Sequence, residues 1–507
     1  AGAVLALAQS AGSLSGRVTD ASTKLALAGA RVSVAGTALE TYTDQAGAYA
    51  LNGVPAGLRT VEVSYVGYPL LSREATIAGA TRLDLAFNEN VVKLDNYVIE
   101  GSAVGTARAI NQQRAAATLT SIVAADEIGR FPDQNAAESL QRLPGVALYR
   151  DQGEGRFIDL RGLNYIYTAV RLNGAGLASP ELGDRAIALD VVPSDSLAAI
   201  EVTKVPTPDQ DASGLGGNVN IRTKSAFDST DRELNVTTGG IYTHLTEKFN
   251  PKVNAAYSDI FAGGTVGVTA GVTWQERDFG SRNFEEDGWS LRTTPGGSPY
   301  FMPDNLGFRD YVINRERFGA NAGLEFKPDA DTLVYLRGAY NKFTDTEDRH
   351  QLYLPFTRGT VLSGDGRSAS FDNVSRVRRD IRIREKDQEL TALTAGFERR
   401  IADWQLDGQA AWSRGVEKRP NETTVRFRRN TSDSDLRYTF NGLYDVTIEQ
   451  LGGASVLDPA NYTTLDRLEV QNNRGRDTEA NFSLNARRDL DRAEPAYVKV
   501  GASYRTK

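Results

Sequence analysis

The chain has 507 residues, of which 40% are hydrophobic and none is cysteine, and its formal net charge is −7 at pH 7. This length indicates several domains. The lack of cysteine excludes disulfides and thiolate chemistry, and the negative charge argues against nucleic-acid binding. The chain has two histidines, His244 and His350, which argues against a histidine-rich metal site or a Ser-His-Asp triad. No apolar run approaches the roughly 20 residues of a membrane-spanning helix, so a membrane role requires strands.

Residues 1–12 begin with a small, apolar stretch in which Ala6-Leu7-Ala8 fits a small-x-small cleavage site. We interpret this segment as the remnant of an export signal, and a frayed soluble N-terminus is the alternative. Export of a chain without cysteine suits the periplasm or the outer membrane of a Gram-negative bacterium.

Residues 13–88 alternate short β-like runs with turn residues at a spacing typical of a small β-sandwich. The sequence of this segment resembles the carboxypeptidase regulatory-like domain. The resemblance implies a seven-stranded accessory sandwich without catalytic residues. The motifs that carry the resemblance are Gly16-Arg-Val-Thr-Asp20, Gly29-Ala-Arg-Val-Ser-Val34, Thr43-Asp-Gln-Ala-Gly-Ala-Tyr49 and Tyr65-Val-Gly-Tyr68.

Residues 89–117 read as a linker. Residues 91–102 form a short apolar segment between polar ones, and an extended segment of this kind can add to the sheet edge of a partner. The alternative is a strand of a neighbouring domain. Residues 103–117 are small and polar, and we expect them to be mobile.

Residues 118–227 combine strands, turns and one short helix. Asn135 is suited to cap a helix that ends before Pro144 and Gly145, and Glu138 is placed to complete a capping box. Asn173-Gly174 is a hairpin signal. The cluster Gly214, Gly216 and Gly217 lacks the spacing of a nucleotide-binding loop, so it is expected to allow close backbone packing. Arg161 and Arg171 lie in apolar strands and should be paired if they are buried.

This segment resembles the plug of a TonB-dependent outer-membrane receptor over about 100 residues, in the order of the family. The resemblance implies a plug inside a barrel of about 22 strands. It also implies a TonB box within residues 91–102, with the candidates Leu94, Asp95, Asn96, Tyr97, Val98, Ile99 and Glu100. The plug motifs that carry it are Phe131-Pro132-Asp133-Gln-Asn135, Glu138-Ser-Leu140-Gln-Arg-Leu-Pro144-Gly145, Asp151-Gln-Gly-Glu-Gly155, Leu160-Arg161-Gly162, Leu172-Asn173-Gly174, Val192-Pro-Ser194, Ile200-Glu-Val202 and Gly214-Leu-Gly216-Gly217-Asn-Val-Asn-Ile-Arg222.

Residues 228–507 hold about nine runs in which apolar and polar residues alternate, as in the strands of a transmembrane β-barrel. Short links alternate with long ones at 277–314, 344–386 and 417–475, as expected for short turns on one side of a membrane and long loops on the other. Nine open strands leave two unpaired edges, so we expect a fragment of a longer barrel. The predicted fold class is therefore mainly β: a sandwich, an α+β plug and a partial antiparallel barrel.

The long links carry aromatic residues that are candidate ligand contacts, although ordinary loop packing explains them equally well. The candidates are Trp289, Tyr300, Tyr353, Tyr438 and Tyr444. No metal site, cofactor or catalytic constellation stands out, so an enzyme is not expected.

The predicted function is TonB-dependent uptake of a bulky solute across the outer membrane, by a monomeric barrel with its N-terminal domain and linker in the periplasm. The expected partners are TonB with its inner-membrane energising complex, outer-membrane lipid and a solute. The plug sequence motif that begins at Phe131 resembles that of receptors associated with oligosaccharide uptake, and this resemblance favours an oligosaccharide as the solute. A ferric-siderophore receptor and a surface binding or signalling protein are the alternatives.

Overall fold

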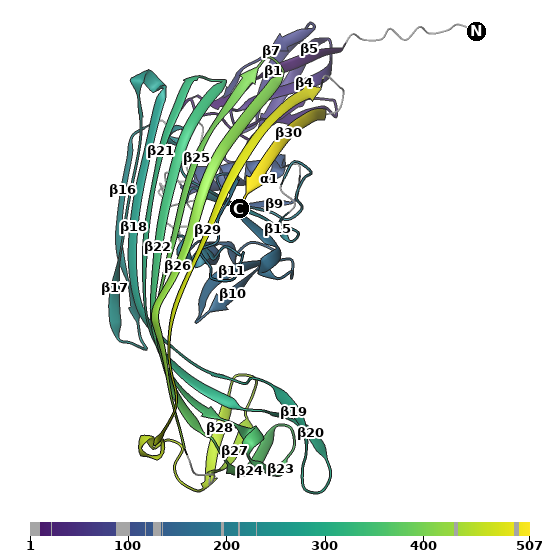
Figure 1. Ribbon diagram of the computed structural model, residues 1–507. Helices are drawn as coiled ribbons and strands as arrows, with labels where there is room; N and C mark the ends of the chain where they lie inside the picture. Colours follow the sequence, from purple (N-terminus) through teal and green to yellow (C-terminus); the bar gives the residue numbers. More distant parts are fainter. Residues whose placement is uncertain are drawn as a thin grey trace, which may run out of the picture.

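The computed structural model describes residues 11–21, 23–87, 102–116, 118–124, 133, 135–193, 197–210, 213–229, 231–429, 434–490 and 496–507. Strands dominate, and they form an N-terminal sandwich, a plug, a large curved antiparallel sheet beside the plug, and an outer lobe at one end of that sheet (Figure 1). The fold is mainly β, as the sequence predicted. Among the described helices, none is both long and apolar enough to cross a membrane.

The N-terminal sandwich consists of two small sheets, with orders β4-β1-β7 (β8 also pairs with β1) and β3-β2-β5-β6. Side chains such as Leu14, Val32 and Val63 fill the space between them and are fully buried. The structure has eight strands rather than seven, because β7 and β8 pair with successive parts of β1. The strands are β1 (Ala11–Asp20), β2 (Arg31–Val34), β3 (Glu40–Tyr42), β4 (Ala48–Pro55), β5 (Gly57–Ser64), β6 (Leu71–Ile77), β7 (Ala80–Arg82) and β8 (Leu85–Phe87).

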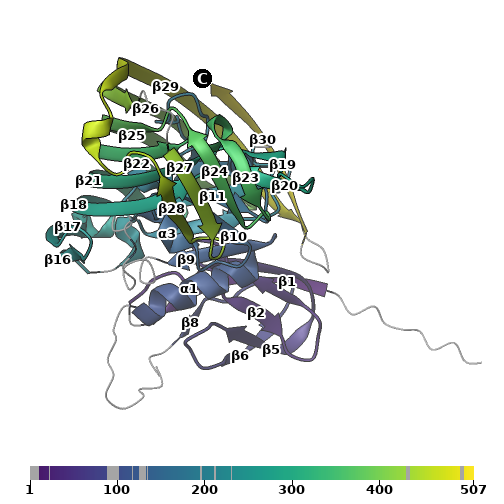
Figure 2. The same cartoon turned by 90° about the horizontal axis from the view of Figure 1, so that it is seen from below.

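A helix, α1 (Ser102–Ala115), stands where the sequence predicted a mobile segment, and that prediction is wrong for these residues. The segment is rich in alanine, which favours a helix. Tertiary contacts then hold it on two sides: Asn111 Oδ1 accepts a hydrogen bond from Val66 N of the sandwich at 3.3 Å, and Ala109 packs against Ile122 of the plug. Figure 2 shows α1 between the sandwich and the plug.

The plug (residues 120–228) is built on a five-stranded sheet with the order β13-β12-β15-β14-β9, and β10 and β11 form a separate hairpin. Asn173 and Gly174, with φ of 51° and 85°, make the predicted tight turn between β12 and β13. Its elements are β9 (Thr120–Ala124), α3 (Ala136–Leu140), β10 (Val146–Asp151), β11 (Glu154–Leu160), η1 (Tyr165–Tyr167), β12 (Thr168–Leu172), β13 (Ala175–Gly176), η2 (Leu189–Val191), β14 (Ala199–Thr203), β15 (Gly217–Arg222) and η4 (Ala226–Asp228).

The predicted helix of the plug is present but short, because α3 ends at Leu140 and turns follow it. Asn135 is the N-cap, and its Oδ1 accepts a hydrogen bond from Glu138 N at 3.1 Å. The predicted capping box is wrong, because the Glu138 carboxylate accepts a hydrogen bond from Gly155 N of β11 at 2.7 Å. The side chain that would have closed the helix end therefore joins α3 to the neighbouring hairpin.

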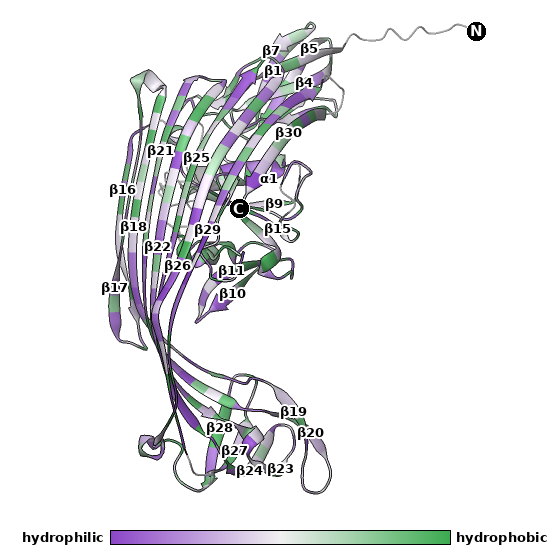
Figure 3. Ribbon diagram, in the orientation of Figure 1, coloured by the Kyte–Doolittle hydropathy of each residue, from purple (hydrophilic) through white to green (hydrophobic). Residues whose placement is uncertain are grey.

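The large sheet has nine antiparallel strands in sequence order, as predicted. Hydrophilic and hydrophobic residues alternate along them (Figure 3). On β21, for example, Leu324 is 52% exposed and its neighbour Glu325 is 1% exposed. Within the described residues the sheet is open, with β16 and β30 as its outer strands. The strands are β16 (Glu233–Thr243), β17 (Lys248–Phe261), β18 (Val266–Glu285), β21 (Leu306–Asp329), β22 (Thr332–Leu354), β25 (Arg378–Ile401), β26 (Trp404–Arg428), β29 (Thr464–Leu490) and β30 (Ala496–Thr506), with η5 (Ala262–Gly264) between β17 and β18.

The long links are folded, and here the structure corrects the prediction of loops. Several strands run far beyond their predicted ends, and the remaining residues form a lobe of two further sheets, called the outer lobe. Phe356, Phe371 and Tyr438 are fully buried in its core, and this burial offsets the entropy lost on ordering the links. The elements of the lobe are β19 (Trp289–Thr293), β20 (Pro299–Pro303), η6 (Phe356–Arg358), β23 (Thr360–Gly364), β24 (Ser368–Val374), β27 (Ser434–Phe440), β28 (Val446–Gly452) and η7 (Pro459–Asn461).

We expect Asn135→Ala to weaken the contact between α3 and β11 by about 1–2 kcal/mol, because it removes both the N-cap bond and the bond from Asn135 Nδ2 to Gly155 O. Hydrogen–deuterium exchange of the amides in α3 and β11 measures this loss. Asn164→Ala, which uncaps the exposed turn η1, is the control and should leave that exchange unchanged. Equal protection of α3 in Asn135→Ala and in the unmodified protein would contradict this role.

Candidate functional site

The plug touches the large sheet through a buried cluster of charges centred on Glu154, the first residue of β11. Glu154 Oε2 lies 2.7 Å from Arg315 Nη1 and 2.6 Å from Arg317 Nη2, both on β21, and Oε1 pairs with Arg277 on β18. Burial acts to raise the pKa of Glu154, but the three guanidinium groups outweigh it and hold that pKa well below its usual range. The carboxylate therefore stays ionised, with three positive charges around it.

Further polar groups compensate the excess positive charge. Arg315 Nε donates a hydrogen bond to Asp345 Oδ1 on β22 at 2.8 Å. Gln152, in the turn of the β10–β11 hairpin, accepts a hydrogen bond from Arg315 and donates one to Glu347 Oε2 at 2.6 Å. Arg317 Nε donates to the carbonyl oxygen of Asp190 in the plug at 2.8 Å. Positive and negative groups thus alternate across the contact, which makes a buried charge network tolerable.

A second group of charges extends the contact along the sheet to β26. Arg156 on β11 pairs with Glu181 and lies 3.1 Å from Asp151. Gln388 on β25 donates hydrogen bonds both to Glu181 Oε1 at 2.7 Å and to Glu417 Oε2 of β26 at 2.8 Å. Burial acts to raise the pKa of Glu181, but Arg156 and Lys386 lower it overall, so this carboxylate is also held in its charged form.

The predicted plug motif holds the Glu154 cluster in place from behind. Asn135 Nδ2 donates to Gly155 O at 3.0 Å, and Gly155 N donates to Glu138 Oε1 at 2.7 Å, so both backbone groups of the residue after Glu154 are fixed by α3. A Cβ atom on Gly155 would lie 2.7 Å from Leu148 Cδ1 and 3.2 Å from Glu138 Oε1, so a larger residue here would have to displace one of these side chains. The motif is therefore a positioning device for β11.

Two ion pairs brace the same motif. Asp133 forms two hydrogen bonds with Arg142 at 2.9 and 2.6 Å, and Glu138 pairs with Arg150 at 2.9 Å. Leu140 is fully buried in the plug core. The remaining two predicted residues of the motif, Phe131 and Pro132, lie outside the described residues, as do the TonB-box candidates 94–100.

Most of the other predicted plug residues occupy turns. The prediction that Arg161 lies in a strand is wrong, because β11 ends at Leu160. Gly145, Arg161 and Gly162 have φ of 74°, 55° and 75°. Arg161 is exposed, and its Nη2 donates to Gly216 O at 3.2 Å.

Pro144 precedes the turn at Gly145, and Gly214, Gly216 and Gly217 allow close backbone approach. At Gly217, a Cβ atom would lie 2.7 Å from Thr203 O. Arg171 Nη1 donates to Gly174 O at 3.3 Å at the β12–β13 turn.

The five aromatic ligand-contact candidates do not meet at one exposed surface. Tyr438 is fully buried, and this burial raises its pKa to about 12. The Cζ atom of the Arg378 guanidinium lies 3.6 Å from the centroid of the Tyr353 ring, and Tyr300 packs against the core of the outer lobe. Trp289 and Tyr444 are 43% and 92% exposed. Four of the five are therefore engaged in packing or stacking, since Trp289 lies 5.5 Å from the Phe440 ring.

A hollow that the sequence did not reveal lies instead between the far ends of the large-sheet strands and the outer lobe, with a volume of about 1050 Å³. Its residues come from segments far apart in the chain, which no local pattern connects. The apolar side chains that line it include Phe284, Phe308, Leu352, Ile381, Phe427 and Leu457, and the polar ones include Arg282, Asp310 and His350. A mostly apolar hollow with a few polar groups is typical of small-molecule sites.

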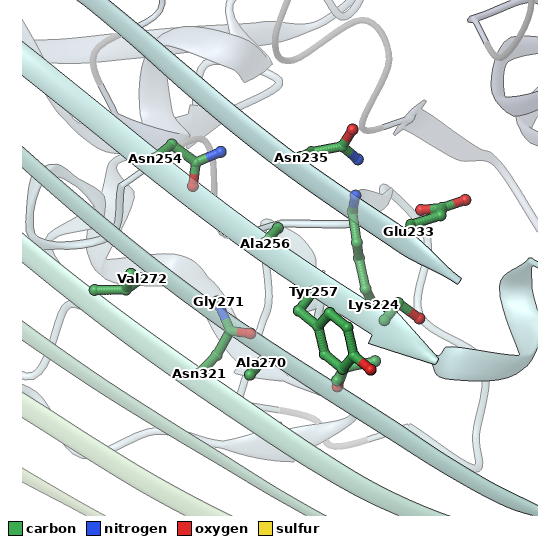
Figure 4. Close-up of a pocket in the computed structure, with 12 residues that line it drawn as sticks. Lys224, Glu233, Asn235, Asn254, Ala256, Tyr257, Ala270, Gly271, Val272 and Asn321 are labelled. Carbon is green, nitrogen blue, oxygen red and sulfur yellow. The ribbon is translucent and has the colours of Figure 1, made fainter. Parts of the chain in front are cut away.

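A much smaller pocket lies near the first strands of the sheet, and Lys224, Glu233, Asn254 and Tyr257 are among the residues that line it (Figure 4). Its volume of about 20 Å³ has room for little more than one water molecule, so it is not a solute site. Among the described residues, no group of three or more His, Asp or Glu side chains is placed to hold a metal ion.

We expect Glu154→Gln to weaken retention of the plug by about 3 kcal/mol, because it leaves buried arginines without their carboxylate. The measurement is the urea concentration at which the plug becomes cleavable by protease while the sheet stays intact. The control is Glu316→Gln on the exposed side of β21, which should cost less than about 1 kcal/mol. Equal shifts for the two variants would contradict the role of Glu154.

The same contact should weaken in acid. The pKa of Glu154 is lower in the folded plug than its ordinary value of 4.5, so its stabilisation is fully present above that pH and is lost as the pH falls toward the folded pKa. We therefore expect the difference in urea concentration between the unmodified protein and Glu154→Gln to shrink as the pH falls below 4.5. A difference that stays constant across this range would argue against an ionised Glu154.

Two family models match the chain. The model described as a CarboxypepD_reg-like domain matches residues 14–99, and the model described as a TonB-dependent Receptor Plug Domain matches residues 112–218. These ranges contain the sandwich and most of the plug. A search of curated protein sequences gives no match.

Solved structures with similarity to the chain include a variant of the ferric enterobactin receptor of Pseudomonas aeruginosa (12% identity, 78% of this chain and 72% of that chain covered, TM-score 0.37). They also include the copper transporter OprC (12%, 76% and 64%, 0.34) and the ferric preacinetobactin receptor of Acinetobacter baumannii (13%, 76% and 57%, 0.35). The chain spans 57 to 72% of the length of these three proteins. The family-model matches, together with the fold, identify the chain as one that carries a carboxypeptidase regulatory-like domain followed by the plug domain of a TonB-dependent receptor.

Proposed function

We propose that this protein takes up a bulky solute across the outer membrane of a Gram-negative bacterium in a TonB-dependent manner. The observation that carries the proposal is a plug domain seated on the polar face of a sheet whose opposite face exposes apolar side chains. Such a band is unfavourable in water and suits contact with outer-membrane lipid. Exposed apolar residues on these strands are Leu234, Val236, Val272, Leu324, Leu336, Leu393, Trp412, Phe482 and Val500.

The two ends of the sheet suggest its orientation. Outer-membrane barrels have short turns on the periplasmic side and long connections outside. The N-terminal sandwich lies at the short-turn end of the sheet, opposite the outer lobe (Figure 1). The sandwich and the linker 89–117 are therefore assigned to the periplasm, where TonB and its inner-membrane energising complex reach the candidate box at Leu94–Glu100.

The plug contact suits a part that must shift. The Glu154 and Arg156 clusters hold the plug through charged and hydrogen-bonded groups. Such groups find water as an alternative partner when they separate, whereas apolar surfaces do not. A pull on the linker reaches the plug through α1 and β9, and β9 is an edge strand of the plug sheet. Displacement of the plug then opens a path for the solute.

An oligosaccharide is the favoured solute, and a ferric siderophore is the second candidate. The hollow of about 1050 Å³ beside the outer lobe is a candidate for first contact, since it combines aromatic rings with charged groups. A surface binding or signalling role on the same scaffold, without transport, is the remaining alternative. We propose that the protein acts as a monomeric barrel without a cofactor.

Deletion of residues 94–100 from the chromosomal gene should abolish uptake of the transported probe and leave its binding at the cell surface unchanged, because the proposed role of the box is to transmit force and not to bind the solute. The measurement compares radiolabelled maltohexaose with iron-labelled ferric enterobactin, each scored for bound and internalised label. Leu58→Ser, on the exposed surface of the sandwich, is the control and should transport normally. Uptake that continues without residues 94–100 would refute TonB-dependent transport.

A further inference from the structure

The N-terminal sandwich is docked against the short-turn ends of the large sheet. Arg17 Nη2 lies 2.7 Å from Asp331 Oδ1, in the turn between β21 and β22. Asp44 pairs with Arg400 near the turn between β25 and β26. Asn52 Nδ2 donates a hydrogen bond to the carbonyl oxygen at the end of β29, Leu490 O, at 2.8 Å. Three separate points of the sandwich thus reach three different places along the sheet.

The docked sandwich forms one wall of a polar chamber of about 560 Å³ on the short-turn side of the plug. Residues 44–46 of the sandwich line it, Arg108 of α1 and Glu201 of the plug face it, and Arg337 and Glu398 of the sheet complete it. Its volume lies in the range of about 300–1,000 Å³ that is usual for small-molecule sites. The chamber lies between plug and sandwich, so a solute that passed the plug on this side would meet the sandwich next.

The linker is attached so that a pull on it loads the docked parts. The TonB-box candidate at 94–100 lies in the chain between Phe87, the end of the sandwich, and Ser102, the start of α1. Helix α1 in turn touches the sandwich closely, because a Cβ atom on Gly29 would lie only 2.6 Å from the backbone of Asn111. Force applied to the box therefore acts on the sandwich from one side and on α1 from the other.

The docking contacts are few and partly exposed, which makes them separable. The side chains of Arg17 and Asp331 are 21% and 46% exposed, and those of Arg400 and Asp44 are 28% and 29% exposed. Ion pairs of this kind contribute about 0–1 kcal/mol each. A pull can break this docking without unfolding the sandwich, whose core is buried separately.

We propose that the N-terminal sandwich is a gate on the short-turn side of the plug: docked, it stands across the polar chamber and obstructs the path of the solute, and the pull on the linker undocks it so that the solute leaves. This inference rests on the proposed transport function. It assigns to the sandwich a role in release, in contrast to a passive accessory domain. The ion pairs Arg17–Asp331 and Asp44–Arg400 form its latch.

The test uses the absence of cysteine from the chain. Asp44→Cys and Arg400→Cys are introduced together in the natural gene and joined by a short thiol-reactive crosslinker that contains a disulfide. Radiolabelled maltohexaose and iron-labelled ferric enterobactin are the two probes. We expect uptake of the probe that the unmodified protein transports to be lost in crosslinked cells and to return after reductant, and we expect surface binding to be unchanged. Each single cysteine variant, treated with the same reagent, cannot be crosslinked and should still take up the probe, because loss of the Asp44–Arg400 pair favours the undocked sandwich.

Uptake that persists in the crosslinked protein would overturn the gate and leave the proposed function intact. A protein that transports neither probe even before crosslinking would overturn the proposed function, and the gate with it. A second variant, Asp44→Lys, tests the latch without any crosslinker. It places a lysine opposite Arg400, so two like charges repel each other at this contact. The sandwich should then show faster hydrogen exchange where it meets the sheet. Unchanged exchange there would also count against the latch.

Discussion

The structure depends on one buried carboxylate. Glu154 faces three arginines that the sheet presents from β18 and β21, and without that negative charge these guanidinium groups would be buried against one another. Removing one partner of a buried ion pair is costly because the other charge remains. The position of β11 therefore fixes the plug in the sheet. Asn135 and Glu138 of α3 fix β11 in turn, through the backbone of the residue that follows Glu154.

The same arrangement separates two kinds of surface on each strand. Inward residues such as Arg317 and Glu325 are almost fully buried and polar, whereas outward residues such as Leu324 are apolar and exposed. Period-two alternation produces both faces from one sequence pattern. The plug contacts the polar face of the sheet, where Phe343, Leu390 and Ala392 also join its hydrophobic core, and the opposite face of the sheet exposes apolar side chains. The sandwich adds partly exposed ion pairs at the short-turn end of the sheet.

Local patterns in the sequence predicted what depends on neighbours in the chain. The cap at Asn135, the turn at Asn173-Gly174 and the nine alternating strands needed no knowledge of distant residues. Distant partners decided the rest. Glu138 turned to Gly155 instead of its own helix end, and residues 102–115 became a helix between two domains. Tyr438 is fully buried, so aromatic residues of the long links form a core instead of an exposed binding surface. The hollow beside the outer lobe could not be predicted, because its residues come from segments far apart in the sequence.

A double-mutant cycle between Glu154 and Arg317 tests the central claim most directly. Glu154→Gln, Arg317→Gln and the double variant are compared by the urea concentration that releases the plug. If this pair holds the plug in the sheet, the coupling free energy should be about 1.5 kcal/mol or more, as for close charge pairs elsewhere. A coupling free energy near zero, with additive single effects, would contradict the account.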